Sequence, residues 1–398
     1  MVNSIKIFIA GDYHGGYQSN NKVVDAIDSS QNPTDLLGDV RSIVQQSDFS
    51  IINLEYPVTF HSKKIVKYGP AAKSNPKCLK ALSDFDAVTL GTNHSADFGN
   101  KGIEDTLRYC KDEGLQTVGV GMNAIDALQP LRINIREKRI SILNFAETQF
   151  NTADSLRGGA NPFDIISNVK SIREEREESD FVLVMIHGGP DLCQYPSPDL
   201  VKRARFYAEE GASAIILHHS RVVSPFEVYK NVPIFYGLGN FIHFTKEPDL
   251  KEQIGLTIQL ELKDSGIDFT LFPVQLDMAT CKLSLITGNK KQALLSEIED
   301  LNLRLLNLDE LKVYWGNHIR QHSELRYLVL LSGIPNTVFK VFRKLNALTF
   351  LKKILLVRKN RFLPILNFLQ NESHNESAKY ILNEIFKKNR EPSSNSSI

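Results

Sequence analysis

The chain has 398 residues, of which 42% are hydrophobic and 23% are charged, and its formal net charge is +1. These proportions are typical of a globular protein and exclude collagen-like, coiled-coil and wholly disordered chains. Four scattered cysteines without a C-x-x-C pair indicate reduced thiols rather than disulfides or a thiolate metal site.

The first part of the chain, to about residue 245, alternates short apolar runs with helical patterns, which is typical of a layered α/β fold. Nearly every residue in these runs is apolar, so we expect strands that are buried on both faces. The predicted strands span residues 5–10, 49–54, 87–91, 181–186, 214–217 and 233–236.

Helices and hairpins complete this pattern. Residues 102–113 predict a helix that ends at Gly114, and Ser197-Pro198 predicts the cap and first turn of another. Two antiparallel hairpins are also predicted, which pair residues 131–135 with 139–144 and residues 255–262 with 267–274, so we expect the sheets to be mixed. Beyond residue 290 the pattern predicts a helical region.

Residue types that bind metals follow five of the predicted strands, where the carboxyl ends of parallel strands share one crevice. Each histidine taken alone is commonly a hydrogen-bonded structural residue. Taken together, the set meets the needs of a site with one or two divalent ions, namely a carboxylate with imidazole and amide ligands from several strands. Nitrogen and oxygen ligands without cysteine favour Mn, Fe, Zn or Co. The residues are Asp12, His14, Glu55, Asn93, His94, His187, His218 and His219.

Ordered motifs lie between about residue 5 and residue 245. They are Gly11-Asp12-Tyr13-His14-Gly15-Gly16, Asn53-Leu54-Glu55-Tyr56-Pro57-Val58-Thr59, Lys67-Tyr68-Gly69-Pro70, Thr92-Asn93-His94-Ser95-Ala96-Asp97-Phe98-Gly99, His187-Gly188-Gly189, Pro196-Ser197-Pro198, His218-His219 and Tyr236-Gly237-Leu238-Gly239-Asn240-Phe241. Together they resemble the CapA family, bacterial proteins linked to poly-gamma-glutamate and polysaccharide capsule synthesis. The resemblance implies the α/β sandwich of calcineurin-like metallophosphoesterases, with two mixed β-sheets flanked by helices. We assign residues 1–288 to this domain, 289–390 to a basic helical extension and 391–398 to a disordered tail.

The resemblance also implies roles for single residues. Asp12 and His14 match the D-x-H pattern of the metal site, and Glu55 takes the place of the bridging Asp. In Thr92-Asn93-His94, the amide is expected on the metal and His94 as general acid. His187 matches the central ligand, and His219 matches the first His of the G-H-x-H element.

The second His of that element is replaced by Arg221. A guanidinium cannot ligate a metal and repels a nearby cation, although it can clamp a phosphate or a carboxylate. Three outcomes stay open: a single metal held by Glu55, Asn93, His187 and His219, a two-metal site whose weaker half keeps Asp12, His14 and Glu55, or a degenerate site. The predicted substrate-binding residues are Arg221, Lys67, His218 and Asn240.

Two functions follow. The first is a metal-dependent hydrolase of phosphoester or amide bonds in the biosynthesis of a capsule or surface polymer. The second is a non-catalytic accessory protein of the same fold with a degenerate metal site. The expected ligand is an anionic polymer precursor, or a small phosphorylated or carboxylated substrate. Either metal-dependent version requires Glu55 and His187 to lie within reach of one cation.

The C-terminal region is basic. Residues 325–371 contain nine Lys or Arg and no Asp or Glu. One helical stripe here consists of the apolar residues Val338, Val341, Phe342 and Leu345. It could lie on an anionic membrane, dock on a synthase partner or pack on the protein core. Packing on the core is the simplest of these interpretations. There is no nucleic-acid signature beyond charge. Without a signal peptide or a long apolar run, we expect a cytoplasmic protein, free or peripheral at the inner membrane face.

Overall fold

The computed structural model describes residues 4–16, 22–244, 250–357 and 362–370, so the predicted tail 391–398 lies outside the described residues. Contacts divide the chain into two compact units, Met1–Lys312 and Val313–Ile398. Residues 289–312, predicted as part of the helical extension, are grouped with the first unit.

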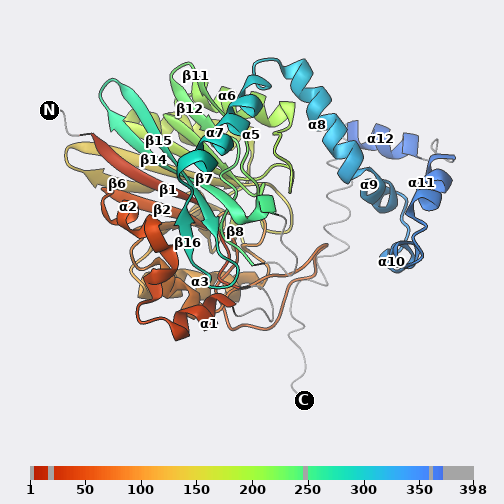
Figure 1. Ribbon diagram of the computed structural model, residues 1–398, viewed down its shortest axis with the longest axis horizontal. Coiled ribbons are helices and arrows are strands. Elements are labelled where there is room, and N and C mark those ends of the chain that lie inside the picture. Colours follow the sequence, from red (N-terminus) through yellow and green to blue (C-terminus); the bar gives the residue numbers. More distant parts are fainter. Residues whose placement is uncertain (1–3, 17–21, 245–249, 358–361, 371–398) are drawn as a thin grey trace. The chain divides into compact units, whose positions relative to one another are not determined.

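The larger sheet of the first unit has the strand order β16-β15-β14-β1-β2-β3-β4, with β13 also paired to β1. Figure 1 labels β1, β2, β14, β15 and β16 of this sheet. Strands β1 to β4 run parallel, and β14 joins β1 in the antiparallel sense. The strands are β1 (Ile5–Tyr13), β2 (Phe49–Leu54), β3 (Ala87–Thr89), β4 (Gln116–Val118), β13 (Asn240–Ile242), β14 (Ile254–Lys263), β15 (Gly266–Leu276) and β16 (Leu283–Leu285).

The second sheet has the order β11-β12-β10-β9-β7-β6 and is parallel except at its two edge strands. A short pair, β5 (Val120–Gly121) with β8 (Gly159–Ala160), lies outside both sheets. The strands of the second sheet are β6 (Leu131–Ile135), β7 (Lys138–Ala146), β9 (Phe181–His187), β10 (Ala214–His218), β11 (Phe226–Tyr229) and β12 (Val232–Phe235).

Three apolar cores hold these layers together. One core lies between the sheets and joins Ile7 and Ile51 to Leu183 and Ile216. The opposite face of the larger sheet packs on α1, η1, η2 and α3, and that of the second sheet packs on α5 and α6. These helices are α1 (Lys22–Ser29), η1 (Pro33–Val40), α2 (Arg41–Gln45), η2 (Pro76–Leu82), α3 (Gly99–Asp112), α4 (Ala124–Ala127), α5 (Ile165–Glu178), α6 (Pro198–Glu209), η3 (Leu250–Gln253) and α7 (Gly288–Leu303).

The predicted fold class is confirmed: two mixed sheets pack face to face and helices flank them. All six predicted strands and both hairpins are present. Ser197 caps α6, with its side chain accepting from the backbone N–H of Leu200 and Pro198 in the first turn. Strand β1 continues to Tyr13, past the predicted end at residue 10, because Asp12 and Tyr13 pair with β13.

The described part of the C-terminal unit is helical. Its small core contains the buried side chains of Val329, Leu351 and Leu355. Its helices are the end of α8 (Leu308–His322), α9 (Glu324–Leu331), α10 (Asn336–Lys344), α11 (Leu348–Val357) and α12 (Leu363–Gln370). None of the described helices combines the length and the hydropathy that crossing a bilayer requires.

Candidate metal centre

The carboxyl ends of strands from both sheets bring the predicted ligands together. Asp12 lies opposite Asn53 in the register of β1 and β2, and His187 lies opposite His218 in β9 and β10. A bulge at Gly11 aims Asp12, whose backbone N–H donates to the Gly239 carbonyl at 3.0 Å. A Cβ on Gly11 would lie 2.2 Å from that carbonyl oxygen, so only glycine fits.

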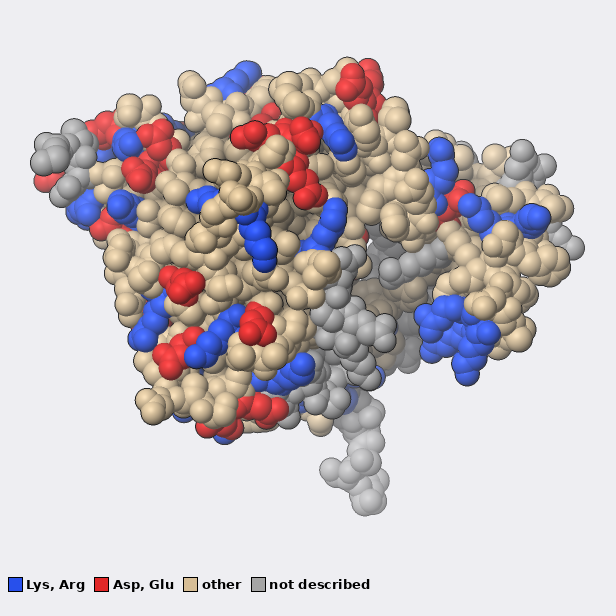
Figure 2. Space-filling view, viewed as in Figure 1, with Lys and Arg blue, Asp and Glu red and all other residues tan. Residues whose placement is uncertain are grey.

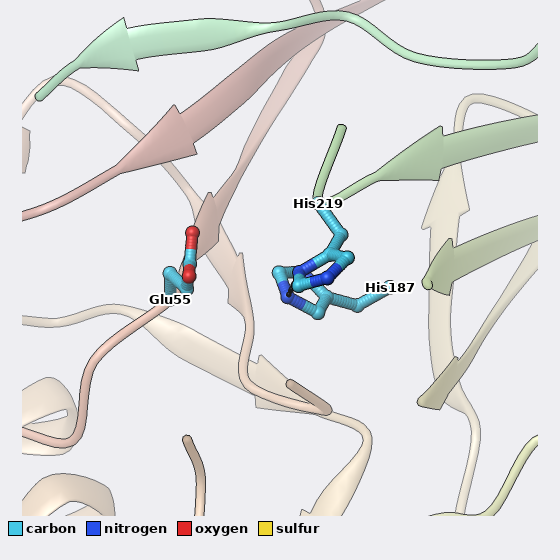
Figure 3. Close-up of side chains that lie close together, drawn as sticks. All are labelled: Glu55, His187 and His219. Carbon is cyan, nitrogen blue, oxygen red and sulfur yellow. Dashed lines mark hydrogen bonds between the residues drawn. The ribbon is translucent and has the colours of Figure 1, made fainter. Parts of the chain in front are cut away.

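Glu55, His187 and His219 form the centre of the site (Figure 3). Their ligand atoms all lie within 4.8 Å of one another, with the carboxylate facing the two imidazole rings. Nε2 of His187 lies 3.1 Å from Nδ1 of His219 and 3.1 Å from Oδ1 of Asn93. Atoms that share one cation at bond lengths of about 2.0–2.2 Å are separated in this way.

This arrangement fits a divalent cation. Oε2 of Glu55 is buried and accepts no hydrogen bond of good geometry from the described residues, which is costly for a carboxylate oxygen unless an ion satisfies it. Two imidazoles, an amide oxygen and a carboxylate are a donor set for Mn, Fe, Zn or Co rather than for Ca. The requirement that one cation reach both Glu55 and His187 is met.

Burial controls the charges of these groups. It lowers the pKa of His187 well below the ordinary value, assisted by His219, so the ring is neutral and offers a lone pair. Burial by itself raises the pKa of Glu55, but the adjacent His14 outweighs it and holds that pKa well below its usual range. Glu55 is therefore a carboxylate.

Asp12 and His14 lie next to this centre. Nε2 of His14 lies 2.6 Å from Oε2 of Glu55, which is within ion-pair distance. The angles at the two atoms do not fit a hydrogen bond. Asp12 accepts from Nδ2 of Asn53 at 2.8 Å and from the backbone N–H of His219 at 3.1 Å. Burial, and then the charge of Glu55, raise the pKa of Asp12 well above its ordinary value, a shift that a bound cation would oppose.

Arg221 carries its charge beside these residues. Its Nη2 lies 2.6 Å from Oε1 of Glu252, and Nη1 lies 3.7 Å from Oδ1 of Asp191. The loop after β10 is strained, since His219 and Arg221 have φ angles of 91° and 61°. The structure therefore pairs Arg221 with carboxylates, and its role toward a substrate stays a prediction.

His94 belongs to a buried network. Nδ1 of His94 is 2.6 Å from Oδ2 of Asp97, which also accepts from the backbone N–H of Ala72 at 2.7 Å. The ammonium of Lys67 contacts the other oxygen of Asp97, and the Lys67 side chain is 5% exposed. Nε2 of His94 faces Glu55, 4.0 Å from Oε1. Lys67 thus faces Asp97, and its predicted contact with substrate stays a prediction.

Two other predicted substrate residues are buried. Nδ1 of His218 lies 3.5 Å from Oδ1 of Asp12, and burial lowers the pKa of His218 to about 3. Nδ2 of Asn240 donates to the Glu252 carbonyl at 2.9 Å. Within the described part of the chain both side chains contact residues next to the ligands, and their assignment to substrate stays a prediction.

Three residues at this site were not among the predicted ligands or substrate residues, although Asn53 and Asp97 belong to the quoted motifs. Asn53 connects Asp12 to His187, since its Nδ2 also lies 3.1 Å from Nδ1 of His187. The ring of His243 stacks on His14 at 3.8 Å between centroids. Asp97 orients His94. A signal existed for Asn53, which lies two residues before Glu55, and for Asp97, which lies one turn after His94, but none existed for His243.

The chain is similar in sequence to known proteins. The chain is 29% identical over 243 residues to the "Capsule biosynthesis protein CapA" of Bacillus anthracis, covering 57% of this chain and 57% of that protein. It is 29% identical over 255 residues to the "PGA biosynthesis protein CapA" of Bacillus subtilis (strain 168), covering 61% of this chain and 65% of that protein. The aligned part therefore spans less than two thirds of either relative.

A solved structure, a hypothetical protein from Thermus thermophilus, aligns with 68% of this chain and 99% of its own, at 12% identity and a TM-score of 0.40. The sequence model of the family described as "Bacterial capsule synthesis protein PGA_cap" matches residues 6–245. This match covers more than half of the 398 residues, including all the candidate ligands. The resemblance stated from the motifs is confirmed, and the chain belongs to the PGA_cap family of bacterial capsule synthesis proteins.

Proposed function

We propose that this protein is a divalent-metal-dependent hydrolase that acts in the biosynthesis of a capsule or polyglutamate-type surface polymer. The observation that carries the proposal is the convergence of Asn93 Oδ1, His187 Nε2 and His219 Nδ1 opposite the carboxylate of Glu55. The names of the two Bacillus relatives support the biological setting. The bond cleaved is a phosphoester or an amide.

We assign one cation position, held by Glu55, Asn93, His187 and His219. When bound, such an ion supplies a water of lowered pKa and polarises the oxygen of the scissile group. The neighbouring position at Asp12 and His14 lies near the positive charge of Arg221, which disfavours a second cation there.

His94 is the residue proposed to move a proton. Asp97 accepts from Nδ1, so the hydrogen on that atom is fixed and Nε2 is the nitrogen that faces the reaction centre. In the imidazolium form of His94, Nε2 also carries a hydrogen, and this is the proton that the ring donates to the leaving group. Lys67 and the backbone N–H of Ala72 keep Asp97 in place, so these two are positioning groups.

Metal analysis tests the proposal. We expect the purified protein to contain close to one equivalent of Mn, Fe, Zn or Co and to hydrolyse a chromogenic phosphoester or γ-glutamyl anilide. His187→Ala should lose both the metal and the activity, since it removes a central ligand. His61→Ala is the matched control. His61 lies outside the site, and its hydrogen bonds with Thr59 and Lys73 are made by its backbone atoms, which the substitution leaves in place.

A metal-free protein that still supports polymer synthesis in cells would contradict the hydrolase and favour the accessory function with a degenerate site. Arg221 is the observation behind this second function, because its charge lies where relatives of this fold are expected to have a ligand. Loss of metal in both the His187→Ala and His61→Ala proteins would also count against the assigned position.

A further inference from the structure

The C-terminal unit has little core for its apolar content. Within its described residues, the buried cluster consists of Val329, Leu351 and Leu355, with five partly buried side chains around it. The partly buried members are Leu325, Leu328, Ile334, Phe339 and Phe342. Many other apolar residues of the unit do not pack on this core and are exposed. Exposed apolar surfaces of this kind mark interaction sites.

These exposed residues recur at helical spacing on three successive helices. In α10 the stripe comprises Val338, Val341 and Leu345, of which Leu345 is 70% exposed. In α11, Val357 is 84% exposed. The full stripes of the other two helices are Phe350, Ile354 and Val357 in α11, and Leu363, Leu366 and Leu369 in α12. Of the predicted stripe in α10, only Phe342 packs on the unit's core.

Positive charge accompanies the apolar stripes. Lys340, Arg343 and Lys344 are all exposed on α10, and Figure 2 shows Lys and Arg gathered over the part of the unit where Figure 1 places α10. Lys353 is exposed on α11. Between residues 313 and 371 the sequence has one acidic residue, Glu324, and its carboxylate contacts Lys352. The unit's field is therefore strongly positive.

We propose that the C-terminal unit docks on an anionic lipid surface, with the exposed stripes of α10 and α11 entering the headgroup region. Apolar stripes on helices bind such an interface, and nearby Lys and Arg are attracted to anionic lipids while their long side chains reach back to the headgroups. A lipid surface can accept separate stripes without matching their shape, whereas a protein partner must complement each of them. Because none of the described helices is suited to cross the bilayer, the binding is peripheral.

Vesicle binding of the full-length protein tests this proposal. We expect sedimentation with vesicles of phosphatidylcholine and phosphatidylglycerol, and not with phosphatidylcholine alone. The triple variant Lys340→Gln, Arg343→Gln, Lys344→Gln should bind about 100-fold more weakly, because each positive charge near the surface contributes about fivefold to the affinity. The double variant Val341→Ser, Leu345→Ser should bind at least about tenfold more weakly.

The matched control is the triple variant Lys111→Gln, Lys202→Gln, Lys290→Gln, which removes the same charge from exposed positions of the first unit. It should bind as the unchanged protein does. All substituted residues are exposed, and circular dichroism verifies that each variant keeps its helices.

Three results would overturn the proposal. The first is that the unchanged protein does not sediment with the anionic vesicles. The second is that the control triple loses as much binding as the α10 triple, which makes the effect one of net charge. The third is self-association in light scattering that Val341→Ser, Leu345→Ser abolishes, without vesicle binding, which makes the occupant a second copy of the chain.

Discussion

At the residue scale, the 2.6 Å contact with Asp97 occupies Nδ1 of His94 and leaves Nε2 facing Glu55, 4.0 Å from Oε1. The ligand atoms that lie within 4.8 Å of one another belong to Glu55, His187 and His219. We regard His94 as a proton donor rather than as a ligand.

We therefore predict that His94→Gln lowers kcat by about 10²-fold or more, the usual contribution of a general acid, while the metal content stays the same. Activity and metal analysis on one preparation measure the two quantities together. Asp97→Asn should shift the pH profile of kcat, because the amide no longer fixes the tautomer of His94. If His94→Gln lost as much metal as His187→Ala is expected to lose, His94 would be a ligand rather than a proton donor.

Arg221 is the second decisive residue. We predict that Arg221→His raises the bound metal from about one to about two equivalents, because it removes a positive charge and supplies an imidazole near Asp12 and His14. Histidine tolerates the left-handed backbone found at Arg221, where φ is 61°. Metal analysis by mass spectrometry gives the number.

Arg221→Gln is the control for this change, because it removes the charge without adding a ligand, and it should stay near one equivalent. Both variants leave Glu252 without its guanidinium, so both should lose stability, by about 1–3 kcal/mol. Two equivalents in Arg221→Gln would show that charge alone had kept the second ion out, and one equivalent in Arg221→His would contradict the prediction.

At the scale of elements, helix caps and strand pairing determine how firmly the ligand loops are held. Asp164 caps α5, which covers the outer face of the second sheet, and it accepts from the backbone N–H of Ser167 at 2.9 Å. That hydrogen bond, against the opposing effect of burial, lowers the pKa of Asp164. The cap therefore contributes more when Asp164 is ionised.

We predict that Asp164→Ala lowers the free energy of unfolding by about 1 kcal/mol near neutral pH. Because the folded pKa lies below the unfolded value, the ionised cap stabilises the protein above the unfolded pKa, and this part is lost as the pH falls through the folded pKa. The free energies of unfolding of the variant and the unchanged protein, measured in urea, should become more alike below about pH 4. Asp164→Asn keeps the acceptor without the charge, so its difference from the unchanged protein should vanish in acid.

The strands were predictable because their apolar runs are local and nearly continuous. The ends of the strands were less predictable. Strand β1 continues to Tyr13 because its end pairs with β2 and with β13, and β13 is more than 200 positions away in sequence. Likewise, His243 had no sequence signal as part of the site, since its stacking on His14 depends on where the chain passes after β13.

At the scale of the whole molecule, every candidate ligand and all three large cores belong to the first unit. We predict that a chain of residues 1–312 folds and binds metal in the same ratio as the full chain, because its last buried core residue is Leu311. Thermal unfolding and metal analysis of the truncated chain test this. A truncated protein that aggregates or loses its metal would show that the C-terminal unit is needed for the fold of the first.

The sequence by itself determined the α/β class, the family and the identity of the residues that could bind a metal, because apolar periodicity and motif order are properties of the chain alone. Only the tertiary structure decided which of these residues meet. It brought Asn93, His187 and His219 opposite Glu55, turned Arg221 toward Glu252 and buried Lys67 against Asp97. Distances between side chains on different strands follow from how two sheets pack, which no local pattern encodes.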